Sequence, residues 1–258
     1  MSVDMETQRH ALVTGGGSGI GAAIALALVD AGMHVTITGR RLDVLELLAA
    51  RHPGKMQAVV MDVADATSVA KAFTQAKTQF GPVQILVNNA GQAHSAPFIK
   101  TDAALWQQML SVNLTGTFHC TQAALPDMVV AKWGRIINVA STAGLVGYAY
   151  VAAYVAAKHG VVGLTRSLAL EYAKKGITVN AVCPGYTETD ILRESIANVV
   201  VKTGRTEEEA RAEFSSGNPQ GRIVQPEEVA DAVRWLCGKA AASVTGQSIA
   251  VSGGEVMN

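Results

Sequence analysis

The stretch "ALVTGGGSGIGAAIALALVDAG" (residues 11–32) decides the fold of this 258-residue chain. It begins with a short apolar run that ends in glycines, which predicts a buried strand followed by a tight turn. An alanine- and leucine-rich helix follows over 20–32 and ends near Gly32. A strand, a glycine turn and a helix in this order predict the first βα unit of an α/β fold.

The same alternation continues to the end of the chain. Further strands are predicted at 34–38, 56–63, 83–91, 135–141, 177–185 and 248–254, and helices at 41–51, 65–80, 102–131, 150–174, 189–201, 206–214 and 226–238. Alternating strands and helices imply βαβ units and a parallel sheet, and continuously apolar strands imply helices on both faces. We therefore predict a Rossmann-type, doubly wound sheet of about seven strands. The chain shows no linker or repeat, so residues 1–258 are predicted to form one domain.

Composition excludes several classes of function. The chain is 49% hydrophobic and 16% charged, with 21 basic and 21 acidic residues, so it lacks the basic surplus that nucleic acid or anionic lipid requires. No apolar run reaches the ~18–20 residues of a membrane span. The three cysteines have no metal-ligand or disulfide spacing, which predicts no metal site and a reducing, cytoplasmic setting. The polar start "MSVDMETQRH" predicts no signal peptide.

The glycine turn is a candidate phosphate site. Thr14 to Gly21 read TGGGSGIG, a TGxxxGxG pattern whose spaced members are Gly15, Gly19 and Gly21. Glycines in such a turn let backbone N–H groups approach a phosphate at a helix N-terminus. A glycine turn can also simply shape a loop, but its position directly after the first strand favours the nucleotide interpretation.

The end of the second strand bears on the choice of coenzyme. Dinucleotide-binding folds that prefer NAD place an acidic residue there, whereas this strand ends in Gly39, Arg40 and Arg41. A guanidinium suits a 2′-phosphate through charge-assisted hydrogen bonds. We therefore favour NADP(H) over NAD(H), which stays possible, with Arg40 as the principal contact. The alternative is that both arginines only solvate the start of the next helix.

Four polar residues are candidates for catalysis. Tyr154 and Lys158 are four residues apart and share one helix face, where an ammonium favours the phenolate and lowers the pKa of the phenol. Ser141 ends the fifth strand, at the sheet edge where open α/β folds bind ligands. Asn113 stands inside a predicted helix although asparagine is a poor helix former. A tyrosine and a lysine at this spacing also occur by chance, so the other two residues strengthen the prediction.

These motifs together closely resemble the short-chain dehydrogenase/reductase family. The resemblance covers the chain from "TGGGSGIG" through "NNAG" (88–91), "INVAS" (137–141), "YVAAK" (154–158) and "PGYTET" (184–189), and within the family it is nearest to bacterial 3-oxoacyl and polyketide ketoreductases. It implies an NAD(P)-dependent oxidoreductase that moves hydride between the nicotinamide and a carbonyl or secondary alcohol. A 3-oxoacyl thioester or cyclic ketone is the favoured substrate.

The resemblance also implies residue roles. Tyr154 would be the general acid/base, Ser141 would orient the carbonyl, Lys158 would lower the pKa of Tyr154 and bind the nicotinamide ribose, and Asn113 would hold a water in a proton relay. The implied coenzyme residues are Gly15, Gly17, Ser18, Gly19, Ile20, Gly21, Arg40, Arg41, Asp62, Val63, Asn89, Ala90, Gly91, Tyr154, Lys158, Pro184, Gly185, Thr187 and Thr189. Substrate choice would depend on 92–98, 142–150 and a substrate lid at 186–222. Tyr148 and Tyr150 are expected to pack or to line the substrate pocket.

Two other functions stay open on the sequence alone. One is an NAD-dependent 3-hydroxyacyl-CoA or secondary-alcohol dehydrogenase, and the other is a non-catalytic dinucleotide sensor on the same scaffold. The apolar character of the predicted helices 102–131 and 150–174, with the family resemblance, implies a homotetramer or homodimer.

Overall fold

The structure is a computed structural model that describes residues 8–257. Residues 1–7, which carry most of the polar stretch behind the signal-peptide prediction, lie outside the described residues. Within 8–257, seven parallel strands form one sheet in the order β3-β2-β1-β4-β5-β6-β7. The strands are β1 (His10–Thr14), β2 (His34–Gly39), β3 (Met56–Val60), β4 (Ile85–Asn88), β5 (Gly134–Val139), β6 (Ile177–Pro184) and β7 (Ser248–Val251).

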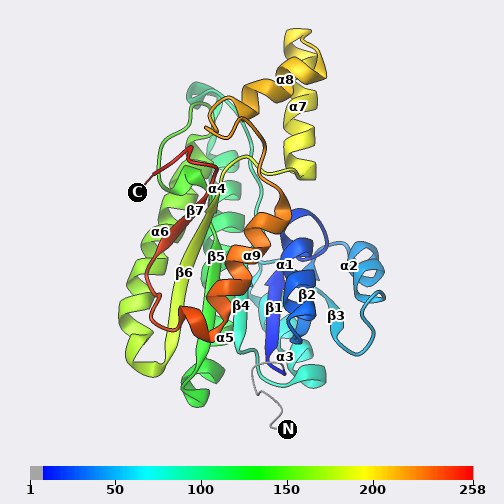
Figure 1. Cartoon of the computed structure of the whole chain (residues 1–258), viewed down its shortest axis with the longest axis vertical. Helices are drawn as coiled ribbons and strands as arrows, with labels where there is room; N and C mark the ends of the chain where they lie inside the picture. Colours follow the sequence, from blue (N-terminus) through cyan, green and yellow to red (C-terminus); the bar gives the residue numbers. More distant parts are fainter. Residues whose placement is uncertain (1–7, 258) are drawn as a thin grey trace.

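Helices connect the strands on both faces of the sheet (Figure 1). The α-helices are α1 (Gly19–Asp30), α2 (Leu42–Ala49), α3 (Ala66–Phe80), α4 (Ala103–Leu110), α5 (Gly116–Ala131), α6 (Ala152–Tyr172), α7 (Asp190–Thr203), α8 (Glu207–Ser215) and α9 (Pro226–Cys237). Short helical segments are η1 (Phe98–Lys100), η2 (Ser111–Thr115), η3 (Thr142–Gly144), η4 (Ala173–Lys175) and η5 (Lys239–Ala241), of which η2 is a π-helix. The predicted doubly wound α/β fold is confirmed.

Alternate residues of each strand separate the core into two layers. Val13 and Ile37 pack with α1, α2 and α9 on one face, whereas Leu12 and Leu86 pack with α3 and α5 on the other. Figure 1 shows α1 and α9 in front of the sheet. Because successive side chains of a strand point to opposite faces, strands covered on both sides must be apolar throughout, as these are.

The predicted helix 102–131 is wrong in one respect, because it is not a regular α-helix along its whole length. It consists of α4, the π-helical turn η2 and α5, and Asn113 lies in the middle of that turn. Gly116 follows the turn, where a Cβ would lie 2.7 Å from Cγ2 of Val63, so the glycine permits the helix to pack closely against 56–63. Pro126 lies inside α5 without ending it.

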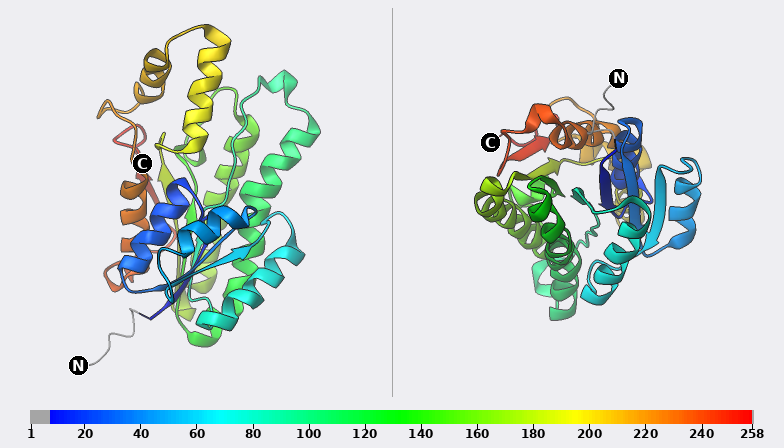
Figure 2. Two further views of the ribbon diagram at one scale, coloured as in Figure 1. Left: turned by 90° about the vertical axis from the view of Figure 1, so that its right-hand side faces the viewer. Right: turned by 90° about the horizontal axis from the view of Figure 1, so that it is seen from below.

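The predicted strands are longer than the observed ones at their carboxyl ends. The region predicted as strand 56–63 pairs only to Val60, and that predicted as 83–91 pairs only from Ile85 to Asn88. Beyond these points the backbone leaves the sheet and lines a cleft. The helices predicted at 189–201 and 206–214 are confirmed as α7 and α8, which rise beyond the carboxyl edge of the sheet (Figure 2).

Candidate active site

A cleft of roughly 1470 Å³ opens at the carboxyl edge of the sheet. Its walls come from the β1–α1 turn, the ends of β2, β4 and β5, helix α6, and the segment that begins at Pro184 and includes α7. Most residues that the sequence assigns to coenzyme or catalysis line this cleft: Gly15, Gly17, Ser18, Gly19, Ile20, Gly21, Arg40, Arg41, Asp62, Val63, Asn89, Ala90, Gly91, Ser141, Tyr154, Lys158, Pro184, Gly185, Thr187 and Thr189. One cavity therefore brings together segments that are far apart in the sequence.

The glycine turn allows very close backbone contacts. A Cβ at Gly21 would lie 2.2 Å from the Gly15 carbonyl oxygen and 2.4 Å from Nδ2 of Asn89. Gly15 and Gly19 have φ angles of 62° and 51°, in the left-handed region that favours glycine. Ser18 is the N-cap of α1 but makes no side-chain cap hydrogen bond, and the first turn of α1 contains no acidic residue. The N-terminus of α1 therefore faces the cleft without a carboxylate of its own.

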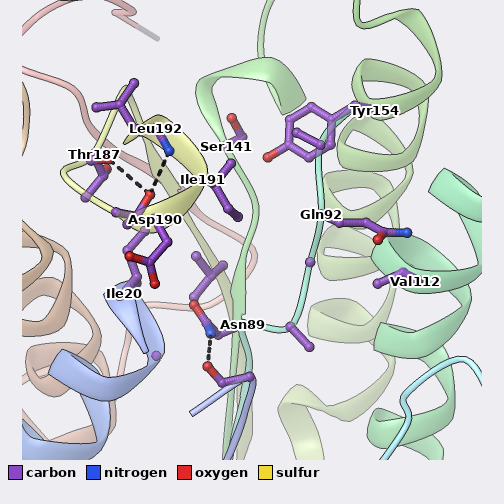
Figure 3. Close-up of a pocket in the computed structure, with 18 of the residues that line it drawn as sticks. Ile20, Asn89, Gln92, Val112, Ser141, Tyr154, Thr187, Asp190, Ile191 and Leu192 are labelled. Carbon is purple, nitrogen blue, oxygen red and sulfur yellow. Dashed lines mark hydrogen bonds between the residues drawn. The ribbon is translucent and has the colours of Figure 1, made fainter. Parts of the chain in front are cut away.

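Thr14 fixes the end of β4 against this turn, a role that the sequence analysis missed. Its hydroxyl oxygen accepts hydrogen bonds from the backbone N–H groups of Asn89 and Ala90, both at 2.9 Å. The Asn89 side chain in turn donates to the carbonyl oxygens of Thr14 and Gly15, at 2.9 and 3.1 Å (Figure 3). The only sequence signal for this role was the threonine at the start of the glycine motif.

The cleft continues past the ends of β2 and β3. Arg40 and Arg41 are exposed there, and among residues 8–257 neither guanidinium forms an ion pair. Thr38, which also lines the cleft, has a buried hydroxyl without a hydrogen-bond partner among the described residues. Asp62 accepts a hydrogen bond from the Ala64 N–H at 2.9 Å, which shapes the loop after β3. This end of the cleft thus offers two unpaired cations.

The other end of the cleft holds the predicted catalytic side chains. In Figure 3 the hydroxyls of Ser141 and Tyr154 face each other across the cleft. Lys158 lies on the same side of α6 as Tyr154, with its Nζ 5.6 Å from the centre of the phenol ring. That Nζ donates to the Val139 carbonyl oxygen at 2.9 Å, and the lysine is buried. Strand β5 and helix α6 therefore present the serine, tyrosine and lysine to one space.

The pKa shifts differ from the expectation that Lys158 lowers the pKa of Tyr154. In this structure burial raises the pKa of Tyr154, and its hydrogen bond with Ser141 opposes that rise. Burial also lowers the pKa of Lys158 to about 8. The reason is that both groups leave water together, so desolvation disfavours the phenolate and the ammonium alike. The hydrogen bond with Ser141 therefore favours the phenolate against the effect of burial, and the role of Lys158 in lowering this pKa stays a prediction.

Asn113 is the one predicted catalytic residue that does not line the cleft. The π-turn η2 directs its side chain towards the segment after β4, where Nδ2 donates to the carbonyl oxygens of Gln92 and Met109, both at 2.9 Å, and Oδ1 accepts from the Gln92 N–H at 3.2 Å. A Cβ at Gly91 would lie 2.8 Å from Oδ1 of Asn113 and 3.7 Å from Nζ of Lys158. Asn113 therefore holds the loop that passes beside the lysine, and its role in a proton relay stays a prediction.

The segment after β6 closes the cleft from the lid side. A Cβ at Gly19 would lie 3.1 Å from Cγ2 of Thr189, so the two walls meet at the glycine turn. Thr189 caps α7 by accepting from the Leu192 N–H at 3.4 Å, and it donates to the Thr187 carbonyl oxygen at 3.2 Å (Figure 3). These contacts place the first turn of α7 directly over the coenzyme end of the cleft.

Three aromatic side chains line the substrate side. The rings of Tyr148 and Tyr186 meet edge-on with centres 6.4 Å apart, and those of Tyr186 and Phe214 meet edge-on at 5.0 Å. Tyr148 was expected to pack or to line the substrate pocket, and it lines the cleft. Tyr150 does not: it is 65% exposed and has a φ angle of 67°.

Comparison with known proteins decides the family. A family model described as short chain dehydrogenase matches residues 9–199. The chain is a short-chain dehydrogenase. It is an oxidoreductase that acts on CH–OH and C=O groups, in a family that binds NAD(P)(H), which confirms the predicted enzyme class.

Relatives of this dehydrogenase include several ketoreductases. It is 39% identical to the 3-oxoacyl-[acyl-carrier-protein] reductase of Aquifex aeolicus over 94% of this chain and 95% of that protein. It is 36% identical to a D-beta-hydroxybutyrate dehydrogenase of Rhizobium meliloti over 95% and 98% of the two chains. The crystal structure of a variant actinorhodin polyketide ketoreductase with NADPH matches it with a TM-score of 0.93, at 38% identity and over 97% and 98% of the two chains.

Two further findings concern the predicted partners. Within residues 8–257, no helix combines the length and the hydropathy that a membrane span requires. No group of three or more histidine, cysteine, aspartate or glutamate side chains in that range is placed to hold a metal ion.

Proposed function

We propose that this short-chain dehydrogenase is an NADP(H)-dependent ketoreductase for a 3-oxoacyl thioester or a related cyclic ketone, with Tyr154 as its general acid. The observation that carries the proposal is the meeting of the Tyr154 and Ser141 hydroxyls at the inner end of the cleft, with Lys158 one helical turn away (Figure 3). A carbonyl oxygen between the two hydroxyls could accept hydrogen bonds from both.

The cleft fits a dinucleotide. The glycine turn leaves space that a Cβ at Gly21 would fill, and the N-terminus of α1 lacks an acidic residue that would repel a pyrophosphate. At the far end, the unpaired Arg40 and Arg41 and the unpartnered hydroxyl of Thr38 suit a phosphate with several acceptor oxygens. These features support NADP(H) over NAD(H), with Arg40 as the principal contact of the 2′-phosphate.

The residues of the cleft account for the protein's part in the reduction. A reduced nicotinamide held in the cleft would supply the hydride for the carbonyl carbon. As electron density moves to the carbonyl oxygen, Tyr154 donates its proton there and the alcohol forms. Ser141 stabilises the developing negative charge through its hydroxyl. Lys158, whose pKa lies near 8, is suited to return a proton to Tyr154 near neutral pH.

The substrate side of the cleft supports a carbonyl compound that is held mainly by apolar contacts. Its wall is aromatic, and four of the five basic side chains in the lid are engaged by carboxylates: Arg193, Arg205, Arg211 and Arg222. Lys202 is the lid cation without an ion-pair partner among the described residues, and it lines the cleft. We propose that residues 186–222 act as the lid over this substrate.

The proposal extends to assembly and location. The helices α4, α5 and α6 carry the exposed apolar side chains Trp106, Phe118 and Leu170. These side chains support a homotetramer or homodimer in which the three helices lie between subunits. Light scattering that shows a monomer would contradict this part. The three cysteines are buried and unpaired, which supports a reducing, cytoplasmic location.

Replacement of Tyr154 tests the proposal most directly. Tyr154→Phe should lower kcat by about 10²–10⁴-fold, since general acid catalysis contributes about that much, while NADPH binding measured by fluorescence titration stays close to that of the parent. Tyr150→Phe is the matched control, because that phenol is exposed and does not line the cleft. Equal activity of the two variants on a 3-oxoacyl thioester and on a cyclic ketone would reject the mechanism.

A second candidate is the oxidative, NAD-dependent reaction. The similarity to a D-beta-hydroxybutyrate dehydrogenase favours it, and the chemistry at Tyr154 would run in reverse. The kcat/KM values for NADPH and NADH, measured with one substrate, separate the two candidates. A preference for NADH would favour the second.

A further inference from the structure

One carboxylate from the C-terminal tail lies behind the substrate side of the cleft. Glu255 lies in the turn that follows β7, and its backbone N–H donates to the Ser252 carbonyl oxygen at 3.2 Å. Its Oε1 accepts a hydrogen bond from the Tyr148 hydroxyl at 2.5 Å. Its Oε2 lies 2.6 Å from the position that a Cβ at Gly185 would occupy, so a side chain at residue 185 would displace the carboxylate.

Glu255 therefore joins the three segments that border the substrate. Tyr148 belongs to the loop 142–150, and Gly185 directly follows β6. Gly217 belongs to the segment 186–222, and a Cβ there would lie 3.8 Å from Oε1 of Glu255. The sequence analysis assigned substrate choice to the segments that hold Tyr148 and Gly217 and assigned Gly185 to the coenzyme, but it did not notice the glutamate.

The single proton of Tyr148 shows how this wall is organised. The tyrosine oxygen lies 2.5 Å from Oε1 of Glu255 and 2.9 Å from Oγ1 of Thr142. An ionised carboxylate only accepts, so the phenol donates to Glu255 and accepts from the Thr142 hydroxyl. Burial and the bond to Glu255 both raise the pKa of Tyr148, which keeps the phenol protonated. Tyr148 thus offers its ring to the substrate while its hydroxyl is occupied.

The charge of Glu255 has no cation against it. Among residues 8–257 no lysine, arginine or histidine forms an ion pair with this carboxylate. Its field also reaches Tyr186, another residue of the cleft wall, whose pKa it helps to raise. A half-buried negative charge directly behind the wall repels a negative charge in front of it, and the repulsion is stronger than it would be in water.

We infer that Glu255 is a specificity-determining residue that makes the substrate pocket select uncharged carbonyl compounds and reject free 3-oxo acids. This inference rests on the proposed ketoreductase function. Esters, thioesters and ring ketones present no charge to the wall formed by Tyr148 and Tyr186, whereas the carboxylate of a 3-oxo acid would approach the charge of Glu255, which no described cation pairs.

The test compares two substrates that share one reacting carbonyl, ethyl acetoacetate and acetoacetate. For the parent enzyme kcat/KM should favour the ester by tenfold or more, on the order expected for like charges at a partly desolvated site. Glu255→Gln keeps the shape and an acceptor for Tyr148 but removes the charge. It should shrink the ester-to-acid ratio about tenfold, mainly through a lower KM for acetoacetate.

Two further variants separate charge from structure. Glu227→Gln makes the same change at an exposed position on α9 and should leave the ratio unaltered. Tyr148→Phe breaks the hydrogen bond but keeps the carboxylate, so it should keep the preference for the ester. If Glu255 acted only as a structural anchor, Tyr148→Phe would change the ratio, and Glu255→Gln, which keeps the acceptor, would leave it unaltered.

The outcomes distinguish this inference from the function beneath it. No turnover of either substrate with either coenzyme would overturn the proposed function and the inference together. Turnover of the ester with a parent ratio near one, or a ratio that Glu255→Gln leaves unchanged, would overturn the inference alone. The parent ratio requires no variant, so the test holds even where Glu255→Gln fails to fold.

Discussion

The buried lysine at the active site should lower the stability of the protein, and its replacement by an apolar residue should raise it. Lys158 is 5% exposed, and desolvation lowers its pKa from 10.5 to about 8. Lys158→Met removes the ammonium and keeps a flexible side chain of similar length. The variant should be more stable than the parent at pH 7 and inactive, since Lys158 is part of the proposed site.

The structure sets the size of this effect. The fall in pKa from 10.5 to about 8 corresponds to about 3 kcal/mol of differential stability, at 1.36 kcal/mol per tenfold change in the equilibrium constant. Loss of the hydrogen bond to the Val139 carbonyl oxygen costs about 1 kcal/mol in the opposite direction. A net gain of about 2 kcal/mol should raise Tm by about 4–8 °C in a chain of this size.

The sign of the effect depends on pH. Below pH 8 the lysine is protonated in both the folded and the unfolded parent, so the cost of burying the charge is present in full. Between about pH 8 and 10.5 the unfolded state binds more protons than the folded state, so the stability of the parent rises with pH. The advantage of Lys158→Met should therefore be largest near pH 7, vanish before pH 10.5 and reverse at pH 10.5, where only the lost hydrogen bond to Val139 counts.

Differential scanning fluorimetry without coenzyme, at fixed protein concentration, measures these Tm values across the pH range. Lys71→Met is the matched control, because Lys71 is exposed on α3 and its replacement should change Tm very little. A Lys158→Met variant that is less stable than the parent at pH 7, or whose advantage does not change with pH, would refute the reasoning.

Three other predictions follow from contacts in the cleft. Arg40→Ser should reduce kcat/KM for NADPH by tenfold or more, because loss of a charged hydrogen bond costs about 1.5–3 kcal/mol. The kcat/KM for NADH should change by less than about twofold. Equal losses for the two coenzymes in steady-state assays would contradict a contact between Arg40 and the 2′-phosphate. Gly21→Ala, whose Cβ would lie 2.2 Å from the Gly15 carbonyl oxygen, should abolish coenzyme binding in a titration, whereas Gly163→Ala, with no atom within 4 Å, should not. Thr14→Val removes the acceptor of two backbone N–H groups and should lower the free energy of unfolding by about 1–3 kcal/mol for each donor left unsatisfied. An unchanged midpoint of urea unfolding would contradict this role of Thr14.

The sequence predicts the fold well because each strand and helix of a doubly wound sheet can be recognised from its own stretch of sequence. Strands buried on both faces are continuously apolar, and each is followed by a helix, so the order of elements is readable without knowledge of tertiary contacts. The strand ends were less predictable. Met61 and Val63 are as apolar as the residues before Val60, and only the cleft, a tertiary feature, ends the pairing there. After Asn88 the residues Asn89, Ala90 and Gly91 are poor strand formers, so the predicted end at residue 91 was too late.

The candidate site was predictable where its residues form motifs and unpredictable where they meet through space. Ser141 and Tyr154 stand at a fixed separation in the sequence, and the structure brings them to one cavity. Glu255 carries no motif and reaches Tyr148 across 107 residues, so only the folded chain shows the contact. The expected lowering of the Tyr154 pKa by Lys158 stays a prediction, because sequence spacing gives proximity but says nothing of desolvation, which raises the pKa of Tyr154 in this structure.

The π-turn η2 also determines the rotation of α5 about its own axis relative to α4. Each residue of an α-helix advances the chain by about 100° around its axis, so a deletion of one residue within Ser111–Thr115 would turn α5 by about that angle relative to α4. Cys120, Ala124 and Met128 would then swing away from the sheet that they now cover. The extra residue of the π-turn therefore fixes which face of α5 packs on the sheet. We expect insertions or deletions there to be tolerated far less well than in the loops at the opposite edge of the sheet.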